Sequence, residues 1–506
     1  MLVGWVYGYS PIKRRSVHKL GIWKIRCPVG NVVVKGYLSA IKTRSDNPIT
    51  YDVTIIGAGI AGSCFAAALG SFEIFKNLKI AVVDPNDIKD VANWIPPTDS
   101  FNTGAWKYTY ADRVMPYSKV VVTDFLGQGS LNFADLISEG VSSEHPAFLI
   151  ENSNLHSACA KALIHNNNSN ITFFQGKVVN FSSFDSSNST TSHNYSDNAS
   201  SLTFPQILLS SNQTIRSKLV VAADGSNSLI RRYANIPSSS LSYNQFGLVA
   251  NLVFDQLNQT AFQRFLPTGP IAILPLSNGF ANLVWSIDSH YVDKLKNVSD
   301  ITFIKLVNMA FRYQNYSDFE YILNSIHHDG SLPESLDLDQ EFNWRINSQN
   351  QNGSFSTLIN SFNEPIQLPP LVMDITPNSR QGFPLRISNS KKYYSSRIAL
   401  IGDAAHTMHP LAGMGFNSGV TDSIQLCSLL KNAILTGSDI GSKEYVLKPY
   451  NDKRYSQNVL LQAAVDHTFL LFQSQNKMVT CSRGILMNLL NKFPLIKNNI
   501  VKSIMY

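Results

Sequence analysis

The sequence predicts an α/β protein in which a Rossmann-like dinucleotide-binding domain is interleaved with an antiparallel-sheet domain and followed by a helical C-terminus. Three observations support this fold class. A glycine-rich turn lies between a strand and a helix near residue 57, two further buried strands end in Asp-Gly or Gly-Asp near residues 224 and 402, and period-two strands occupy residues 245–286. A chain of 506 residues is longer than one typical domain, so two domains are expected.

The domain boundaries follow changes in pattern along the chain. We expect a basic segment at 1–50, the first parts of the dinucleotide-binding domain at 51–240, a substrate-binding sheet domain at 241–385, the last part of the first domain with helices at 386–475, and an amphipathic segment at 476–506. Residues 182–201 have almost no apolar content, which predicts a disordered surface insertion in the first domain.

The composition excludes several classes of protein. Five cysteines form no CxxC pair and their number is odd, so neither a disulfide framework nor a zinc site is expected, and no metal is predicted. The net charge is +7, but the first fifty residues alone carry +8, which leaves −1 for the rest of the chain. Because the body is nearly neutral, nothing suggests a nucleic-acid-binding surface.

The N-terminus has the character of a mitochondrial transit peptide. Residues 1–45 contain nine lysines and arginines, no acidic residue, and scattered serine and apolar residues. The alternative is a basic, poorly ordered tail. No run of eighteen apolar residues occurs in the chain, so a membrane-spanning helix is not expected.

The first motif is Gly57-Ala-Gly59-Ile-Ala-Gly62, which follows a strand at 53–56 and opens a helix rich in alanine. A second strand at 80–83 ends on Asp84. This arrangement is the dinucleotide-binding fingerprint, in which the three glycines allow a tight turn against the pyrophosphate and the acid accepts hydrogen bonds from the ribose of the adenosine half.

The second motif is Asp224-Gly225, which follows a buried strand at 219–222. We expect Asp224 near the pyrophosphate and Arg231 supporting the loop by pairing. The alternative is simply a capped helix.

The third motif joins a strand at 398–401 to a helix that begins after residue 413. Asp403, which follows Gly402, can accept hydrogen bonds from sugar hydroxyls, and Gly413 and Gly415 let the backbone approach a flat ring. The helix N-terminus favours an anion such as a reduced flavin. Asn417 completes the predicted cofactor contacts.

The strands at 245–286 present an aromatic and aliphatic face. Either this face is core, or it lines a pocket for an apolar aromatic substrate, closed by Phe383. The candidate substrate residues are Arg264, Phe265, Leu266, Pro267, Leu274, Trp285 and Phe383.

The end of the chain, 482–505, alternates apolar with basic residues, and Pro494 divides it into two pieces. Such a segment can lie on an anionic membrane surface, although packing against the body is an equal alternative.

Taken together, the three motifs near residues 57, 224 and 402 resemble those of the class A flavoprotein aromatic hydroxylases. Within that group, the segments RFLPTGPIAILPLSN (264–278), LVWS (283–286) and IGDAAHTMHPLAGMGFN (401–417) resemble the ubiquinone-biosynthesis monooxygenase family. The resemblance covers the chain from Tyr51 to about Asp466.

The resemblance implies an FAD-dependent enzyme that hydroxylates the ring of a polyprenylated hydroxybenzoate or phenol, at ring position C5, with O2 and a flavin C4a-hydroperoxide. It also implies that His409 and Pro410 position the flavin ring and that no side chain acts as a nucleophile; His406 or His409 could instead be structural. It further implies electrons from a ferredoxin and ferredoxin reductase, assembly with other ubiquinone-biosynthesis proteins in a membrane-associated complex, and a peripheral location on the matrix face of the mitochondrial inner membrane.

Three departures from the family pattern stand out. No arginine occurs between Asp84 and Trp106, where the family has an FAD-contacting arginine, and the interval is short. Met414 replaces the glutamine of the usual GQG, and Asp84 replaces the usual glutamate. The alternatives are a related flavoprotein hydroxylase of another aromatic or isoprenoid substrate, or a non-catalytic subunit of the biosynthetic complex.

Overall fold

The computed structural model describes residues 48–93, 109–117, 119–133, 147–165, 170–182, 204–313, 315–343, 358–359, 365–493 and 496. The transit-like segment, nearly all of the insertion predicted at 182–201, and the short interval after Asp84 beyond residue 93 lie outside the described residues.

The first domain is built on an eight-stranded sheet whose centre is parallel, in the order β20-β10-β1-β2-β7. Strand β20, most of β2 and the carboxyl halves of β1 and β10 are largely apolar and buried, as expected for a parallel sheet covered by helices. The strands are β1 (Ile49–Ile56), β2 (Ile80–Asp84), β7 (Ile171–Gln175), β8 (Val178–Ser182), β9 (Gln206–Leu209), β10 (Thr214–Ala222), β19 (Tyr394–Ser395) and β20 (Ile398–Leu400). The helices of this domain are α1 (Ile60–Ser71), α2 (Ile88–Ala92), α3 (Asn152–His165), α4 (Leu229–Tyr233) and α9 (Met414–Leu435).

The second domain is built on a nine-stranded sheet, mostly antiparallel, in the order β21-β18-β11-β14-β13-β12-β4-β5, with β17 paired to β11. Its strands are β4 (Lys119–Asp124), β5 (Ser130–Phe133), β11 (Ser238–Phe254), β12 (Thr260–Leu266), β13 (Gly269–Pro275), β14 (Phe280–Asp288), β17 (Val372–Ile375), β18 (Gln381–Ser390) and β21 (His406–Thr407). Helices α5 (Ser289–Asn297), α6 (Asp300–Arg312) and α7 (Tyr316–Ser325) enclose a core with the apolar residues of one face. These features confirm the predicted fold class.

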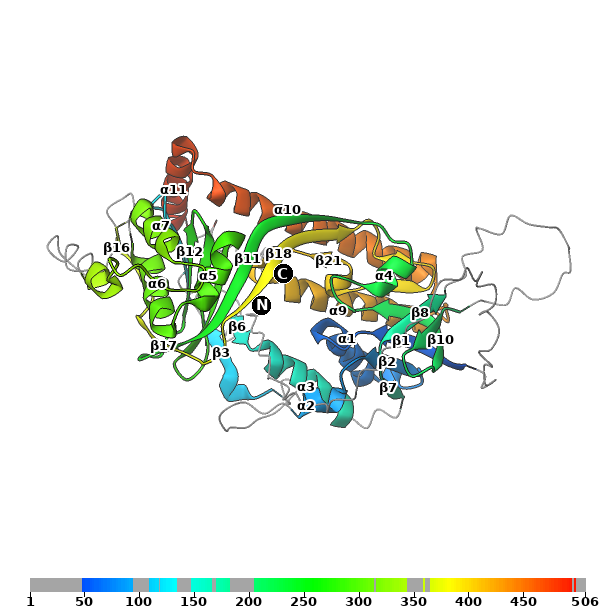
Figure 1. Cartoon of the computed structure of the whole chain (residues 1–506). Coiled ribbons are helices and arrows are strands. Elements are labelled where there is room, and N and C mark those ends of the chain that lie inside the picture. Colours follow the sequence, from blue (N-terminus) through cyan, green and yellow to red (C-terminus); the bar gives the residue numbers. More distant parts are fainter. Residues whose placement is uncertain are drawn as a thin grey trace, which may run out of the picture.

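The chain crosses between the two domains more often than the predicted boundaries state. Strands β4 and β5 belong to the second sheet, although the sequence placed all of 51–240 in the first domain. The long strands β11 and β18 curve from one domain to the other (Figure 1), with a shift in their pairing between Ser242 and Phe246. Two small sheets complete the described strands, β3 (Val114–Tyr117) with β6 (Ala147–Ile150) and β15 (Leu358–Ile359) with β16 (Pro365–Ile366).

The C-terminal helices α10 (Lys448–Gln473) and α11 (Lys477–Asn491) lie along the outside of both domains. Figure 1 shows α10 running over the top of the molecule and α11 rising beyond the body at its end. A buried ion pair between Arg483 and Asp124, with Nε–Oδ2 at 2.7 Å, fixes α11 to the second domain. Among the described helices, none has the length and apolar character needed to cross a membrane.

Candidate cofactor and substrate site

The three predicted cofactor motifs lie at one edge of the first sheet. Strands β20, β10, β1 and β2 are adjacent and parallel, and their carboxyl ends carry Gly402-Asp403, Asp224, the Gly57 loop and Asp84 in that order. Adjacent strands are about 4.8 Å apart, so the motifs extend over roughly 14 Å. This spacing suits an extended dinucleotide with its adenosine end at Asp84 and its other end at Asp403, because ligands of open α/β sheets bind outside these carboxyl ends.

The glycine loop after β1 packs against protein atoms at Gly57 and Gly62 and is open at Gly59. A Cβ atom on Gly57 would lie 2.4 Å from the carbonyl oxygen of Ala223, and one on Gly62 would lie 2.0 Å from that of Gly57, so both positions exclude any larger residue. A Cβ atom on Gly59 would meet nothing within 4 Å. The loop therefore offers an open backbone surface at the start of α1, which fits a pyrophosphate group.

Asp84 contacts the glycine loop directly. Its Oδ2 accepts a hydrogen bond from the amide of Ala58 at 2.7 Å, and its Oδ1 accepts one from the amide of Asn86 at 2.8 Å. A carboxylate has about four acceptor sites, so the group can still accept from a ribose hydroxyl.

His156, on α3, holds the same loop from the other side. Its Nε2 donates to the carbonyl oxygen of Ala58 at 2.5 Å. Burial lowers the pKa of His156, and this effect outweighs the opposing effects of the Ala58 carbonyl and of Asp84. The imidazole therefore acts as a neutral donor that fixes the loop, and sequence analysis did not identify it because an isolated histidine on a helix carries no motif.

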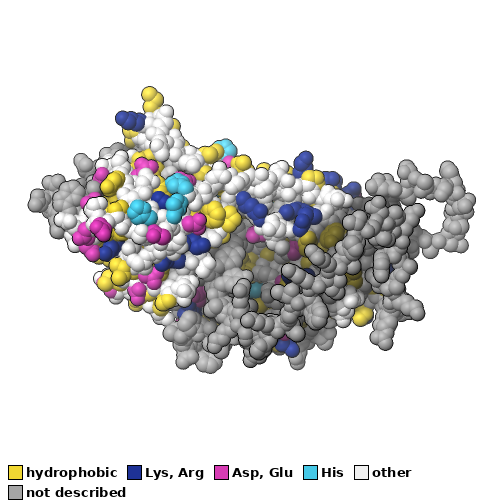
Figure 2. Space-filling view, in the orientation of Figure 1, with side chains coloured by type: hydrophobic (Ala, Val, Ile, Leu, Met, Phe, Trp, Pro, Cys, Tyr) yellow, Lys and Arg dark blue, Asp and Glu magenta, His cyan; other side chains and the backbone are white. Residues whose placement is uncertain are grey.

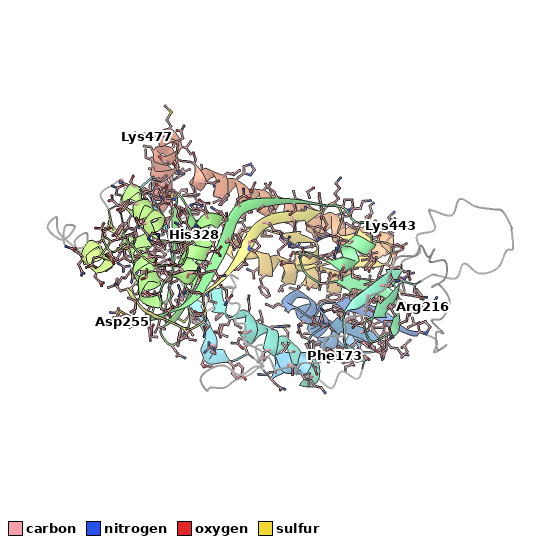
Figure 3. The ribbon with its side chains drawn as sticks, viewed as in Figure 1. Phe173, Arg216, Asp255, His328, Lys443 and Lys477 are labelled. Atoms are coloured by element: carbon pink, nitrogen blue, oxygen red, sulfur yellow. The ribbon has the colours of Figure 1, made fainter. Side chains whose placement is uncertain are left out.

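A cavity of about 720 Å³ opens beside Asp84 between β2, β7, α2 and α3. Its walls combine apolar side chains, including Phe173 (labelled in Figure 3) and Phe174, with polar groups near Asp84 and Lys89. An apolar cavity with a few polar groups is the usual form of a small-molecule site, and its place at the Asp84 end suits an adenine ring.

Asp224 caps a helix and also faces the site. Its Oδ2 accepts from the amides of Leu229 and Ile230, at 2.7 and 3.3 Å, whereas its buried Oδ1 has no partner among the described residues. Burial raises the pKa of this carboxyl against the lowering effect of these hydrogen bonds. The capped-helix alternative is therefore compatible with a cofactor contact through Oδ1.

Arg231 joins the second motif to the third through two backbone carbonyls. Its guanidinium donates to the carbonyl oxygens of Ala404 and Ser226, both at 2.8 Å. Arg231 thus supports the loop as expected, and it does so by donating hydrogen bonds to carbonyl oxygens. Arg386 of β18 also reaches this loop, where it donates to the side chains of Ser226 and Asn227.

Asp403 stands at the end of β20 with its carboxylate open to solvent and with no hydrogen-bond partner among the described residues. Nearby protein atoms desolvate the carboxyl in part and raise its pKa, against the lowering effects of His406 and Arg386. Gly402 before it has a φ of 58°, and a Cβ atom there would lie 3.1 Å from that of Ala61 on α1. Asp403 is therefore a free acceptor on a tightly fixed turn.

A buried carboxylate, Asp422 of α9, fixes this turn through hydrogen bonds. Its Oδ2 accepts from the amide of Gly402 at 3.0 Å and from Nε2 of His406 at 2.7 Å. Its Oδ1 accepts from Nε of Arg454 at 2.7 Å and from Nδ2 of Asn458 at 3.3 Å. Burial alone would raise the pKa of Asp422, but His406 and Arg454 outweigh it and hold the pKa below its usual range. His406 thus supports the turn through its Nε2.

The loop from His409 to Gly413 leads into α9. His409 Nδ1 accepts a hydrogen bond from the amide of Leu411 at 3.1 Å, and its ring packs edge-on against Tyr243 and tilted against Phe469. Pro410 opens the short helix Pro410–Ala412, and Gly413 has a φ of 60°, which glycine adopts without strain. Gly415 and Asn417 lie in the first turn of α9, so the predicted loop residues converge on one helix N-terminus.

The predicted substrate residues divide between the two faces of the second sheet. Arg264, Leu266 and Trp285 are buried on the face that the helices cover; Arg264 donates to the carbonyl oxygens of Ala310 and Tyr313, at 3.1 and 2.7 Å. Burial lowers the pKa of Arg264 to about 9, against the raising effect of Asp124. These three side chains therefore do not face the site, because alternate residues of a strand point to opposite faces. Pro267 is buried in the turn that follows β12.

The opposite face carries the other predicted substrate residues. Phe265 stacks on Phe472 of α10 with ring centroids 3.7 Å apart, and Leu274 packs beside the β3–β6 ribbon. Phe383 pairs with Gly247, whose missing side chain leaves room for the ring. Between them lie Ala272 and Val284, which are directly opposite one another and half-buried, and which sequence analysis did not select.

Comparisons with known proteins identify relatives of the chain. Residues 349–459 match the family model described as an FAD binding domain. The chain is similar to the mitochondrial ubiquinone biosynthesis monooxygenase COQ6 of Schizosaccharomyces pombe, with 31% identity over 500 residues that cover 96% of this chain and 98% of that protein. It is also 31% identical over 492 residues to the protein of that name from Saccharomyces cerevisiae, covering 94% of this chain and 97% of that one.

A solved structure shares the fold. The p-nitrophenol 4-monooxygenase PnpA of Pseudomonas putida superposes with a TM-score of 0.57 at 14% identity, covering 90% of this chain and 97% of that chain.

Proposed function

Since the chain belongs to the family of ubiquinone biosynthesis monooxygenases, we propose that it hydroxylates the aromatic ring of a prenylated hydroxybenzoate or phenol precursor of ubiquinone. It is an FAD-dependent aromatic-ring monooxygenase, and its cofactor is FAD. The finer assignment, a polyprenyl tail and hydroxylation at ring position C5, is part of the proposal. The observation that carries it is the alignment of the Gly57 loop, Asp84, Asp224 and Asp403 along one sheet edge, opposite an apolar sheet face.

The chain's own groups bind and orient the cofactor. We assign the adenosine to Asp84 and its cavity, the pyrophosphate to Gly57, Gly59 and Gly62, and the sugar-like chain before the ring to Asp403. Asp224 and Gly225 border the pyrophosphate, and the N-terminal turn of α9 stabilises the negative charge of the reduced ring. When reduced, the bound flavin supplies the two electrons needed for one atom of O2 to enter the aromatic ring of the substrate and the other to leave as water.

His409 and Pro410 are assigned to positioning the flavin ring. In neutral His409 the proton lies on Nε2, because Nδ1 accepts from the amide of Leu411. Nε2 is buried and has no partner among the described residues. We therefore propose that His409 donates this hydrogen bond to the ring or to the substrate, and that no side chain acts as a nucleophile.

The substrate ring is assigned to the sheet face that carries Phe265, Leu274 and Phe383. An electron-rich phenol needs orientation and exclusion of water more than it needs acid or base catalysis, and an apolar face supplies both. Arg264, Leu266, Pro267 and Trp285 are left out of the proposal because they are buried on the other side of the sheet or in the turn after β12.

For location and partners, we propose a mitochondrial enzyme at the matrix face of the inner membrane, supplied by a ferredoxin and its reductase within a biosynthetic complex. Support comes from the basic, acid-free residues 1–45 and from the word mitochondrial in the names of the relatives. These partners remain proposals.

The test is Asp403→Ala, with Asp403→Asn as a matched control that keeps one acceptor oxygen. Because Asp403 has no partner among the described residues, neither change should alter folding. We expect Asp403→Ala to weaken FAD binding about tenfold or more, as for a lost hydrogen bond to a charged group, and to abolish ring hydroxylation. The measurements are bound flavin per chain and hydroxylated product. Unchanged quinone production with Asp403→Ala would instead support a non-catalytic subunit.

A further inference from the structure

Two cysteines from different helices meet beside the glycine loop. Cys64 lies one turn into α1 and Cys159 lies on α3, and their Sγ atoms are 3.4 Å apart. The two helices pack side by side (Figure 1). The pair was not apparent from the sequence because its members are 95 residues apart. The sulfur atoms of a disulfide are about 2.05 Å apart, so an approach of about 1.4 Å would link the two thiols.

Each cysteine lies about one helical turn from a group that shapes the glycine loop. Cys64 follows the first turn of α1, which begins after Gly59, where the loop leaves its backbone open. Cys159 comes three residues after His156, whose Nε2 donates to the carbonyl oxygen of Ala58. This hydrogen bond joins α3 to the loop. A covalent link between the two cysteines would therefore reinforce a contact that already exists.

The two thiols differ in their access to solvent. Cys64 is half-buried, whereas Cys159 is buried, so an oxidant that arrives from solvent meets Cys64 first. The hydrogen bond with Cys159, together with burial, raises the pKa of Cys64 well above its usual value. Because the thiolate is the reactive species, Cys64 reacts slowly, and the pair stays open until an oxidant accumulates.

The other described cysteines are placed differently. Cys427 is buried in the core of the first domain, where burial raises its pKa to about 12. Cys481 is exposed on α11, which projects from the second domain, far from α1 and α3 (Figure 1 and Figure 2). Among the cysteines that the structure describes, a link is therefore expected between Cys64 and Cys159.

We propose that Cys64 and Cys159 form a reversible redox clamp on the glycine loop, which closes when hydrogen peroxide accumulates. Cys64 attacks one oxygen of the peroxide, the O–O bond breaks, and a sulfenic acid and one water form. The sulfur of Cys159 then attacks the sulfur of Cys64, the S–O bond breaks, and a disulfide and a second water form. The two thiols give up two electrons and two protons to one peroxide, which becomes two waters. A small dithiol reopens the clamp.

The closed clamp should slow the release of FAD. Release requires the glycine loop to open locally, and a link between α1 and α3 disfavours every opening that separates these helices. The clamp thus keeps the cofactor bound under oxidising conditions. This inference uses FAD as the cofactor but does not depend on the identity of the aromatic substrate.

The first experiment maps the link in the full-length, FAD-loaded protein carrying Cys27→Ser/Cys481→Ser, which removes the exposed thiol that could join separate molecules. Of five cysteines three remain, Cys64, Cys159 and Cys427. After treatment with hydrogen peroxide, the thiols counted in denatured protein should fall from three to one. Digestion should yield two peptides joined through Cys64 and Cys159, and dithiothreitol should restore all three thiols.

Three further variants in the same background serve as controls. Cys64→Ala and Cys159→Ala should each abolish the joined peptides, because one member of the pair is missing. Cys427→Ala is the matched control, since it removes a buried cysteine outside the pair and should leave the joined peptides unchanged.

The second experiment follows the release of FAD after dilution by the rise of free flavin fluorescence. The oxidised protein should release FAD about fivefold more slowly than the reduced protein, because the link suppresses local opening. Oxidised Cys64→Ala and Cys159→Ala should release FAD as they do when reduced.

Two results would overturn the proposal. One is oxidation of Cys64 to sulfinic or sulfonic acid without any joined peptides, which would mean that the two thiols cannot reach one another. The other is an equal rate of FAD release from the oxidised and the reduced protein, which would mean that the link does not act on the loop.

Discussion

At the scale of single residues, His409 shows how burial fixes a protonation state. The side chain is 1% exposed and is enclosed by Tyr243, Phe469 and the amide of Leu411, and Tyr243 donates its hydroxyl to Asp466. Burial lowers the pKa of His409 to about 4. In the unfolded chain the pKa is about 6.5, so between these values only the unfolded state takes up the proton.

This difference predicts a pH dependence of stability. Above about pH 7.5 both states are neutral at His409 and no dependence arises from it. As the pH falls from 7 to 5, protonation of the unfolded state should lower the free energy of unfolding by about 2 kcal/mol. His409→Asn can keep the hydrogen bond to Leu411, because Asn is a good N-cap, but does not titrate. Urea unfolding at both pH values measures the effect; an equal loss in protein and variant contradicts the assignment.

At the scale of elements, the contacts of Asp422 join α9, α10 and the turn after β20 in one buried network. Arg454 and Asn458 of α10 bond to one oxygen of Asp422, and Gly402 and His406 bond to the other. Because its folded pKa is lowered, Asp422 contributes its full stability at neutral pH and loses it only as the pH falls below about 4. Helices α9 and α10 thereby fix the turn at Gly402-Asp403.

Asp422→Ala should therefore destabilise the protein by about 3–5 kcal/mol, since it leaves the guanidinium of Arg454 buried without its partner. Arg454→Met should be similarly harmful, whereas the double variant should lose less than the sum of the two, because neither charge is then left alone. Denaturant unfolding of the four proteins gives the coupling energy. Additive losses would show that the ion pair does not act as a unit. Asp422→Ala should also weaken FAD binding, because the Gly402 amide loses its anchor.

The elements that the sequence predicted well are those with a local signal. The Gly57 fingerprint, the strands ending at Asp84 and Asp224, and the loop from Gly402 to Gly413 follow from short patterns of glycine, acid and apolar residues. The partners of those motifs did not follow, because the contacts of His156 with Ala58 and of Asp422 with Gly402 join residues with no shared motif. The sequence signal that could have indicated this network is the presence of Asp422 and Arg454 among the apolar residues of α9 and α10.

At the scale of the whole molecule, the second sheet separates a sealed core, covered by α5, α6 and α7, from a face that contacts α10 and the β3–β6 ribbon. Period two in the sequence indicated that two faces exist, but not which residues belong to each, because β11, β12, β13 and β14 are apolar on both. Register decides it: Trp285 pairs with Leu248 and Ile271 on the helix-covered face, whereas Phe383 pairs with Gly247 on the other.

Truncations on the two faces of the sheet should therefore affect different properties, stability on one face and substrate binding on the other. Trp285→Ala should cost about 3–5 kcal/mol of stability, because it leaves a cavity in a sealed core. Phe383→Ala removes a half-buried ring from the proposed substrate face, so it should cost little stability but raise the KM for a prenylated phenol about fivefold, as expected for one lost apolar contact. Denaturant unfolding and steady-state kinetics with one prenylated substrate separate the two. A large stability loss and an unchanged KM for Phe383→Ala would place the substrate elsewhere, and the apolar face would then be core on both sides.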